Sequence, residues 1–247
     1  MTKPSFVNIF GIPITRLDLN EIPNAAVEII KKPGKKAFFY VNAHCLNLAN
    51  RDVEYKKILQ RASLVYSGGI GPVLASRFLC KPLAQRTPTP DFIEKVLDYS
   101  QNNNWSIYLV GTTDASLKTA VRKLQKQFPK LKIAGFHNGF FDVIEEKKLI
   151  ADINKKKPTI VLIGMGTPKQ EKWINDNKDR LNAHVFWAVG AMFDVISGSM
   201  PRAPLWSQKL GLEWLYRLYQ EPRRLWRRYT LGNAVFIVSV IRQWINK

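Results

Sequence analysis

Short apolar runs alternate with amphipathic stretches through the middle of the chain. The runs "KAFFYVN", "SLVY", "WSIYLVG", "TIVLIGMG" and "HVFWAVG" are apolar on every face, which is typical of parallel strands covered on both sides. The stretches between them repeat apolar residues at helical spacing. Helices are expected over 43–62, 72–79, 114–129, 145–157 and 167–181. The alternation predicts a doubly wound α/β fold with a mostly parallel, Rossmann-like sheet.

The pattern changes after residue 200. Residues 201–247 show no strand pattern, and helices are expected over about 204–220 and 222–245. The second helix is basic at its start and apolar later, and Trp and Tyr are mixed with Arg. This mixture favours a helix in a membrane interface, while an amphipathic helix docked on the domain is the alternative. We therefore expect an α/β core over 1–200 and a helical, membrane-binding appendage over 201–247.

The charge of the chain narrows the classes of partner. The formal net charge is +19 and the pI is near 10.0, while 46% hydrophobic residues are enough for a sizeable core. Such an excess of positive charge favours a nucleic acid, an anionic membrane surface or a phosphorylated substrate. Cys45 and Cys80 predict neither a disulfide framework nor a zinc ribbon. The start "MTKPSFVNIFGIPI" does not read as a signal peptide, and no apolar run is long enough to span a membrane, so a cytoplasmic location is expected.

Glycines follow several of the expected strands. They are Gly68, Gly69 and Gly71 after one strand, Gly111 after another, and Gly164 and Gly166 after a third. In open parallel sheets ligands bind outside the carboxyl ends of the strands. A single glycine is equally explained by a tight turn, but several at one sheet edge favour a pocket.

The segment "GTPKQEKW" begins one of the expected helices. Thr167 stands where an N-cap belongs, Pro168 takes the first helical position, and Gln170 completes a T-x-x-Q capping box. This arrangement explains the helix start without a ligand. Lys169, Gln170 and the first-turn amides would also face the sheet edge, where a helix N-terminus can hold a phosphate. Both interpretations remain open at this point.

Other chemistries find little support in the sequence. The chain has no P-loop, G-x-G-x-x-G, G-x-S-x-G, D-x-D or H-E-x-x-H motif, and no Cys/His cluster. We therefore predict neither a metal nor a cofactor. His44, His137 and His184 lie apart in the sequence and are each expected to be structural.

Four longer motifs are specific enough to suggest a family. They are "GMGTPKQEKW", "VGAMFDVISG", "RAPLWSQKLGLEWLYRL" and "EPRRLWRR". With these, the chain resembles the WecG/TagA/CpsF glycosyltransferases of bacterial surface-polysaccharide synthesis, from "NIFGIPI" to the basic tail. The resemblance implies an appendage that brings the enzyme to the inner face of the cell membrane as a peripheral protein. It also implies an inverting, metal-independent transfer of an N-acetylmannosamine-type sugar from a UDP donor. The implied acceptor is an N-acetylglucosamine-type sugar on undecaprenyl diphosphate, in cell-wall polysaccharide or teichoic acid-type synthesis.

The resemblance also implies site residues. Asn42 and Gln170 match residues of the substrate pocket, and Arg86 matches an arginine near the active site. The appendage arginines are expected to grip diphosphate or to close over the pocket. Together with the strand-end glycines, the predicted substrate-binding set is Asn42, Gly68, Gly69, Arg86, Gly111, Gly166, Lys169, Gln170, Arg217, Arg224 and Arg227. The alternative for each arginine is a solvated surface charge. For Asn42 the alternative is a cap on the following helix.

The chain departs from the family pattern where the active site is expected. Members usually read D-G-x-G where this chain has "SGGIG", so the candidate general base falls on Gly68. Tyr40 stands where Thr is common, and "RTPTPD" lacks the glycine that commonly precedes the aspartate matching Asp91. Because glycine cannot accept a proton, three hypotheses remain. Asp194 or Asp91 replaces the base, the donor or acceptor differs, or the protein binds its ligands and turns over poorly.

Two hypotheses from other classes remain beside the glycosyltransferase. A catalytically inactive scaffold would follow from Gly68. A basic nucleic-acid-binding module would follow from the charge and the Arg/Trp tail, but no RNA-binding signature is present, so nucleic acid is the less favoured partner. The sequence also leaves a homo-oligomer open.

Overall fold

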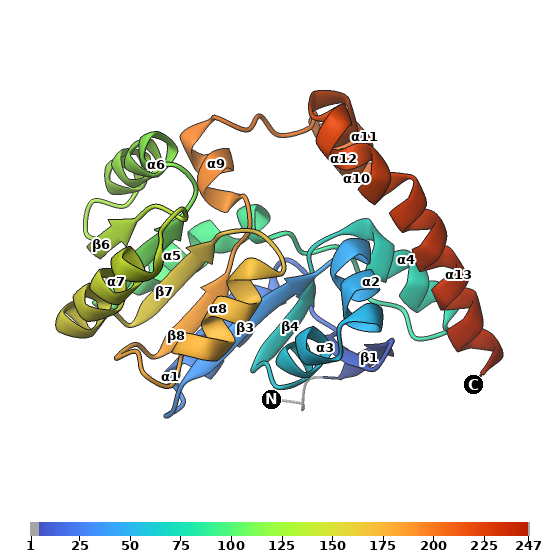
Figure 1. The fold of residues 1–247 in the computed structure, drawn as a ribbon, viewed down its shortest axis with the longest axis horizontal. Helices are drawn as coiled ribbons and strands as arrows, with labels where there is room; N and C mark the ends of the chain where they lie inside the picture. Colours follow the sequence, from blue (N-terminus) through green and yellow to red (C-terminus); the bar gives the residue numbers. More distant parts are fainter. Residues whose placement is uncertain (1–4, 247) are drawn as a thin grey trace.

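A computed structural model describes residues 5–246 and has three layers, with a parallel sheet between two layers of helices (Figure 1). The six strands lie in the order β4-β3-β8-β7-β5-β6, and every neighbouring pair is parallel. The strands are β3 (Lys36–Val41), β4 (Leu64–Ser67), β5 (Ser106–Gly111), β6 (Lys132–His137), β7 (Ile160–Gly164) and β8 (Val185–Ala188). The predicted doubly wound, Rossmann-like α/β fold is confirmed.

Apolar side chains cover both faces of the sheet. On β7, Val161 and Ile163 pack on one helix layer, whereas Ile160 and Leu162 pack on the other. The first layer contains α2 (Ala43–Arg51), α3 (Val53–Gln60), α4 (Ile70–Phe78), α7 (Val143–Lys156) and α8 (Lys169–Asn177). The second layer contains α1 (Glu21–Lys31), α5 (Ile93–Asn102), α6 (Asp114–Gln127) and α9 (Met192–Ser197). Burial on both faces is why these strands read as continuous apolar runs.

The strand order brings four strand ends together. The last strand, β8, lies between β3 and β7, and β4 lies on the other side of β3. Helices α2, α4, α8 and α9 begin shortly after the carboxyl ends of β3, β4, β7 and β8, respectively. The loops that carry most of the sequence motifs therefore meet at one edge of the sheet, as expected for a ligand site in this class of fold.

The N-terminal half contains elements that the apolar pattern did not predict. Strands β1 (Phe6–Ile9) and β2 (Ile12–Thr15) form an antiparallel hairpin, and α1, α5 and the short 3-10 helix η1 (Thr89–Asp91) are further additions. The single helix expected over 43–62 is also wrong, because it is divided into α2 and α3. Asp52 causes the division, since its side chain accepts a hydrogen bond from the Tyr55 amide at 2.9 Å and caps the second helix.

The two helices expected after residue 200 are each broken once. The four observed helices are α10 (Leu205–Lys209), α11 (Glu213–Gln220), α12 (Pro222–Tyr229) and α13 (Leu231–Ile245). Gly211 separates the first pair with a φ of +72°, and its missing side chain makes room for Ile70, whose Cγ1 would lie 2.8 Å from a Cβ there. Thr230 separates the second pair.

Helix α13 is docked on the core. Phe236 and Val240 are buried, and the ring of Phe236 meets that of Phe10 edge-on at 5.7 Å. Gln243 exchanges hydrogen bonds with the backbone of β1 and its turn, accepting from the Phe10 amide at 2.9 Å and donating to the Asn8 carbonyl at 3.0 Å. Within residues 5–246, no helix combines the length and apolarity that crossing a bilayer requires.

Candidate active site

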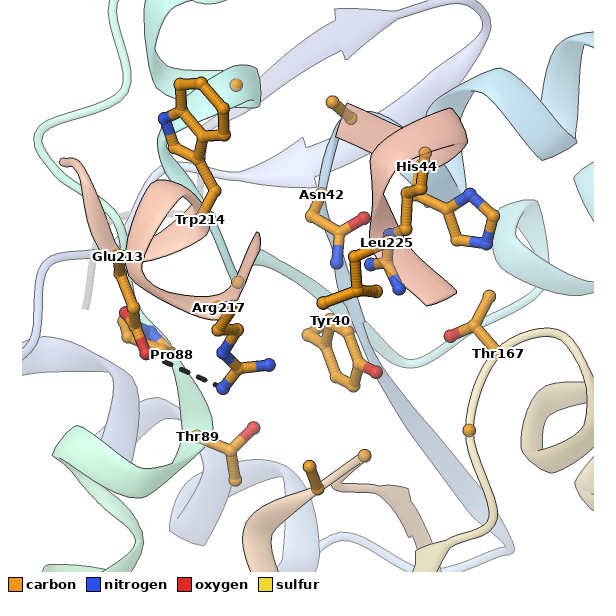
Figure 2. A pocket seen from close by; sticks show the side chains of 18 of the residues that line it. Tyr40, Asn42, His44, Pro88, Thr89, Thr167, Glu213, Trp214, Arg217 and Leu225 are labelled. Atoms are coloured by element: carbon orange, nitrogen blue, oxygen red, sulfur yellow. Dashed lines mark ion pairs between the residues drawn. The ribbon is translucent and has the colours of Figure 1, made fainter. Parts of the chain in front are cut away.

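A cavity of about 1130 Å³ opens at the carboxyl edge of the sheet, between the core and helices α11 to α13 (Figure 2). The loops after β3, β4, β7 and β8 form its floor, and side chains from the C-terminal helices form its wall. Pockets for one small ligand are commonly about 300–1,000 Å³. This cavity therefore has room for the reacting parts of two substrates.

The cavity is strongly basic. Two carboxylates, Asp194 and Glu213, line it alongside six basic side chains: Arg86, Lys169, Arg202, Arg217, Arg224 and Arg228. Helix α4 also begins at the cavity, and no side chain caps its N-terminus. Free first-turn amides and the positive end of a helix dipole favour anions. The charge and the helix start together suit a diphosphate.

A chain of ion pairs joins the core to α11. Arg86 contacts Glu213 at 3.0 Å and Asp91 at 3.7 Å, and Glu213 also contacts Arg217 at 3.6 Å (dashed line in Figure 2). Arg202 contacts the other oxygen of Asp91 at 2.5 Å. Asp91 thus lies between two guanidinium groups and is not among the residues that line the cavity.

Asp194 is differently placed. It lies on α9 and lines the cavity. Its Oδ1 accepts hydrogen bonds from the hydroxyls of Thr112 and Ser199, whereas Oδ2 has no hydrogen-bond partner among the described residues. Of the two carboxylates predicted as substitute bases, only Asp194 lines the cavity.

Tyr40 lies on the floor of the cavity, below Asn42 and between Arg217 and Thr167 in the view of Figure 2. Two glycines make room for its ring. A Cβ at Gly68 would lie 2.8 Å from Tyr40 Cδ2, and a Cβ at Gly190 would lie 2.6 Å from the Tyr40 hydroxyl. Real Cβ atoms essentially never approach so closely, so Tyr40 excludes side chains at both positions. Glycine at 68 therefore has a local steric reason, which is the tyrosine at 40.

The start of α8 differs from the predicted capping box. The helix begins at Lys169 with Pro168 at the N-cap, and no side chain caps it. The Thr167 hydroxyl instead donates to Glu171 Oε1 at 2.9 Å, and the Gln170 amide donates to the same oxygen at 2.8 Å. The capping box is wrong because both side chains are engaged by Glu171.

Gln170 links this cluster to the floor. It is fully buried, its Oε1 accepts from the Gly190 amide at 3.2 Å, and its Nε2 lies 3.4 Å from the Tyr40 hydroxyl. Gln170 does not line the cavity. Its influence on a bound ligand would therefore pass through Tyr40 and Gly190, which both line the cavity.

Burial changes the protonation of several groups around the floor. It raises the pKa of Glu171 to about 7, and hydrogen bonds from Gln170 and Thr167 oppose this effect. It also raises the pKa of Tyr40, so that hydroxyl stays protonated at neutral pH. For His44, burial and the charge of Arg228 lower the pKa to about 4, which leaves a neutral imidazole at the cavity.

A model of the glycosyl transferase WecG/TagA/CpsF family matches residues 7–247. The chain belongs to this family. Relatives from Staphylococcus aureus strains MW2, NCTC 8325 and N315 are 30% identical over 243 residues, which is 98% of this chain and 95% of each relative. Each is named N-acetylglucosaminyldiphosphoundecaprenol N-acetyl-beta-D-mannosaminyltransferase. As a member of the WecG/TagA/CpsF family, the chain is a glycosyltransferase.

Most of the residues predicted to form the site in this glycosyltransferase line one cavity. They are Asn42, Gly68, Gly69, Arg86, Gly166, Lys169, Asp194, Arg217 and Arg224. Asn42 also caps α2, as its alternative predicted, because its side chain accepts a hydrogen bond from the Cys45 amide at 3.1 Å. Which of these residues contact substrate stays a prediction.

Four of the predicted residues do not line the cavity: Asp91, Gly111, Gln170 and Arg227. Gly111 ends β5, where it pairs with Gly164 of the parallel neighbour β7; its φ is +151° and an ideal Cβ would lie only 2.4 Å from the Gly164 carbonyl oxygen. Its glycine is therefore explained by strand packing. Arg227 lies over the ring of its neighbour Trp226 at 5.3 Å.

Arg228 is a cavity residue that the sequence analysis did not select. Its Nε is buried and has no hydrogen-bond partner among the described residues. Helical spacing alone could have identified Arg228. At about 100° per residue, Arg228 lies about 60° from Leu225 around the helix axis, whereas Arg227 lies about 160° from it. Leu225 is buried and marks the inward face of α12, so Arg228 shares that face.

Proposed function

We propose that this glycosyltransferase moves a sugar from a UDP-sugar donor to a sugar carried on a polyprenyl diphosphate. The observation that carries the proposal is the basic cavity at the sheet's carboxyl edge. Both proposed substrates are polyanions with a pyrophosphate group, and six basic side chains against two carboxylates leave a positive excess to receive them. The proposed sugars are an N-acetylmannosamine-type donor and an N-acetylglucosamine-type acceptor, in keeping with the names of the relatives.

The reaction is proposed to be a single inverting displacement. An acceptor hydroxyl oxygen attacks the anomeric carbon, the bond from that carbon to the UDP oxygen breaks, and UDP leaves with the bonding electrons. The hydroxyl proton passes to Asp194, which lines the cavity and whose Oδ2 has no hydrogen-bond partner among the described residues. A positioned base of this kind typically contributes 10²- to 10⁴-fold to the rate.

Arginines are proposed to offset the charge that develops on UDP. Arg217 and Arg228 line the cavity from α11 and α12, and the Nε of Arg228 has no partner within residues 5–246. A buried donor without a partner is costly, and a phosphate oxygen would satisfy it. The proposal includes metal independence, because guanidinium groups would stabilise the leaving group electrostatically.

The C-terminal helices are proposed to hold the enzyme on the inner face of the cell membrane. Of the 20 exposed large apolar side chains in residues 5–246, 12 follow residue 200, including Trp206, Tyr219 and Trp226. The same segment, 201–247, carries nine basic residues and two acidic ones. Apolar and aromatic groups beside arginines suit an anionic lipid surface.

A donor screen with product mass spectrometry tests the proposal. Candidate UDP-sugars are supplied with an N-acetylglucosamine diphosphate acceptor on a short lipid, and UDP release is measured with and without EDTA. We expect one donor to give a product heavier by one sugar, at a rate that EDTA leaves unchanged. Transfer of another sugar would support the altered-substrate hypothesis, and binding without transfer would support the scaffold. Loss of transfer in EDTA would contradict metal independence.

A further inference from the structure

An apolar groove extends from the basic cavity between helices α4 and α13. Leu74 and Phe78 of α4 and Ile237 and Ile241 of α13 all line it, although they are 54%, 47%, 58% and 41% exposed. Two helices thus present large apolar side chains to one shared space without filling it. Leaving such surface exposed is unfavourable in water.

The side chains of α13 that line the cavity differ in exposure. Phe236 and Val240 line it and are buried against the core, whereas Ile237 and Ile241 line it and stay exposed, one turn and two turns after Asn233. Val238 is exposed as well, but it does not line the cavity. The groove is therefore a defined stripe of α13 and not the whole apolar helix.

The polarity of the wall changes along its length. Along the chain, the lining residues of the wall are Arg224 and Arg228 in α12, then Asn233 near the start of α13, and then Ile237 and Ile241. At the far end the ring of Phe78 meets that of Trp244 at 5.6 Å. A ligand that matches this order has an anionic group at one end and an apolar chain at the other.

We propose that the groove binds the proximal isoprene units of the polyprenyl chain on the acceptor. This rests on the proposed function, since the chain enters the groove only when its diphosphate lies against the arginines. The stripe from Ile70 to Phe78 is about 12 Å long at 1.5 Å per residue, enough for a few isoprene units. A single chain can contact both helices across the groove, whereas a bilayer surface would contact the outer face of α13, where Val238 is exposed.

A chain-length series without detergent or vesicles tests the groove. The acceptors share one sugar diphosphate and carry one, two, three or four isoprene units. Since each buried CH₂ contributes about 0.8 kcal/mol, we expect KM to fall by about tenfold or more between the shortest and the longest acceptor, and to level off once the groove is filled. A flat series in which transfer still occurs would overturn the groove and leave the proposed function standing. No transfer to any acceptor would overturn the proposed function and the groove with it.

Matched variants test whether the groove side chains cause the dependence on acceptor chain length. In Leu74→Ser and Ile241→Ser, we expect the ratio of kcat/KM between the longest and shortest acceptors to fall at least fivefold, while Val238→Ser keeps the ratio of the parent. An equal loss in Val238→Ser would overturn the groove. Should a groove variant fail to fold, the parent protein can be photolabelled with an acceptor analogue that carries benzophenone at its third isoprene unit. We expect labels within 70–78 and 231–245, and labels elsewhere would overturn the groove.

Discussion

The floor and the wall of the cavity are built in opposite ways. On the floor, Tyr40, Gly68 and Gly190 fit one another by steric exclusion, and Gln170 and Glu171 hold them from below through hydrogen bonds. On the wall, buried side chains such as Leu225 and Phe236 anchor the helices, whereas Arg224, Ile237 and Ile241 line the cavity and are exposed. Packing among the floor residues accounts for their identities. The exposed arginines and apolar side chains of the wall are instead accounted for by contact with a ligand or a membrane.

This difference predicts how substitutions will act. A change in the floor disturbs close packing and lowers the free energy of unfolding before it affects chemistry. A change in the wall removes a ligand contact and leaves the fold largely unaffected, since exposed ion pairs contribute little to stability. Stability and activity, measured together, therefore distinguish the two regions.

The largest loss of stability is expected from a substitution at Gly111. Gly111→Ala combines a left-handed φ with a Cβ only 2.4 Å from the Gly164 backbone oxygen, which has no freedom to withdraw. We expect a loss of about 4 kcal/mol in the free energy of unfolding, measured in urea. Gly166→Ala is the matched control, because its φ is +79° but nothing lies within 4 Å of the new Cβ. Its loss should be about 1 kcal/mol, and equal losses would mean that strand crowding has no part in the effect.

The next-largest change in stability is expected to depend on pH. Glu171 is buried and its pKa is raised to about 7 from 4.5, so the unfolded chain loses this proton at lower pH than the folded chain does. Stability should therefore be full below about pH 4.5, fall as pH rises to about 7, and then level off, by about 3 kcal/mol in total. Glu171→Gln should remove this slope in urea titrations between pH 5 and 8. Glu54→Gln, an exposed carboxyl, is the control, and a slope that persists in Glu171→Gln would assign it to other groups.

The steric fit on the floor predicts coupling between two positions. Gly68→Asp alone should lower the free energy of unfolding by about 2 kcal/mol, because its Cβ would lie 2.8 Å from Tyr40. Tyr40→Thr alone leaves a void and should also destabilise. The double variant should recover at least about 1.5 kcal/mol relative to the sum of the two. Additive losses would show that the tyrosine does not determine the glycine, and donor preference of the double variant would then show whether an aspartate there alters the reaction.

The fold was more predictable from the sequence than the site was. Strands such as Ile160–Gly164 are buried on both faces, so their apolar runs report the sheet directly. Most of the site residues selected from the sequence line the cavity, but a linear motif does not show which residues of a segment face that space. Gln170, in the first turn of α8, and Gly111, at the end of β5, are therefore at the expected edge of the sheet but do not line the cavity. The steric link between Tyr40 in β3 and Gly68, directly after β4, was not visible in the sequence because the two residues are far apart along the chain.

The smallest effect on stability is expected on the wall, at Arg228. Arg228→Ala should lower kcat/KM by about 30-fold, since a guanidinium that meets a phosphate forms strong charge-assisted hydrogen bonds. The free energy of unfolding should change by less than about 1 kcal/mol, because Nε has no partner in the described chain to lose. The pKa of His44 should rise in this variant, since the charge of Arg228 contributes to its low value, and NMR titration of the imidazole measures this. Arg227→Ala is the matched control, one residue away and stacked on Trp226, and should stay within about twofold with a soluble acceptor. If both variants lose activity equally, the arginines act through the general positive charge of α12 and not through a contact in the cavity.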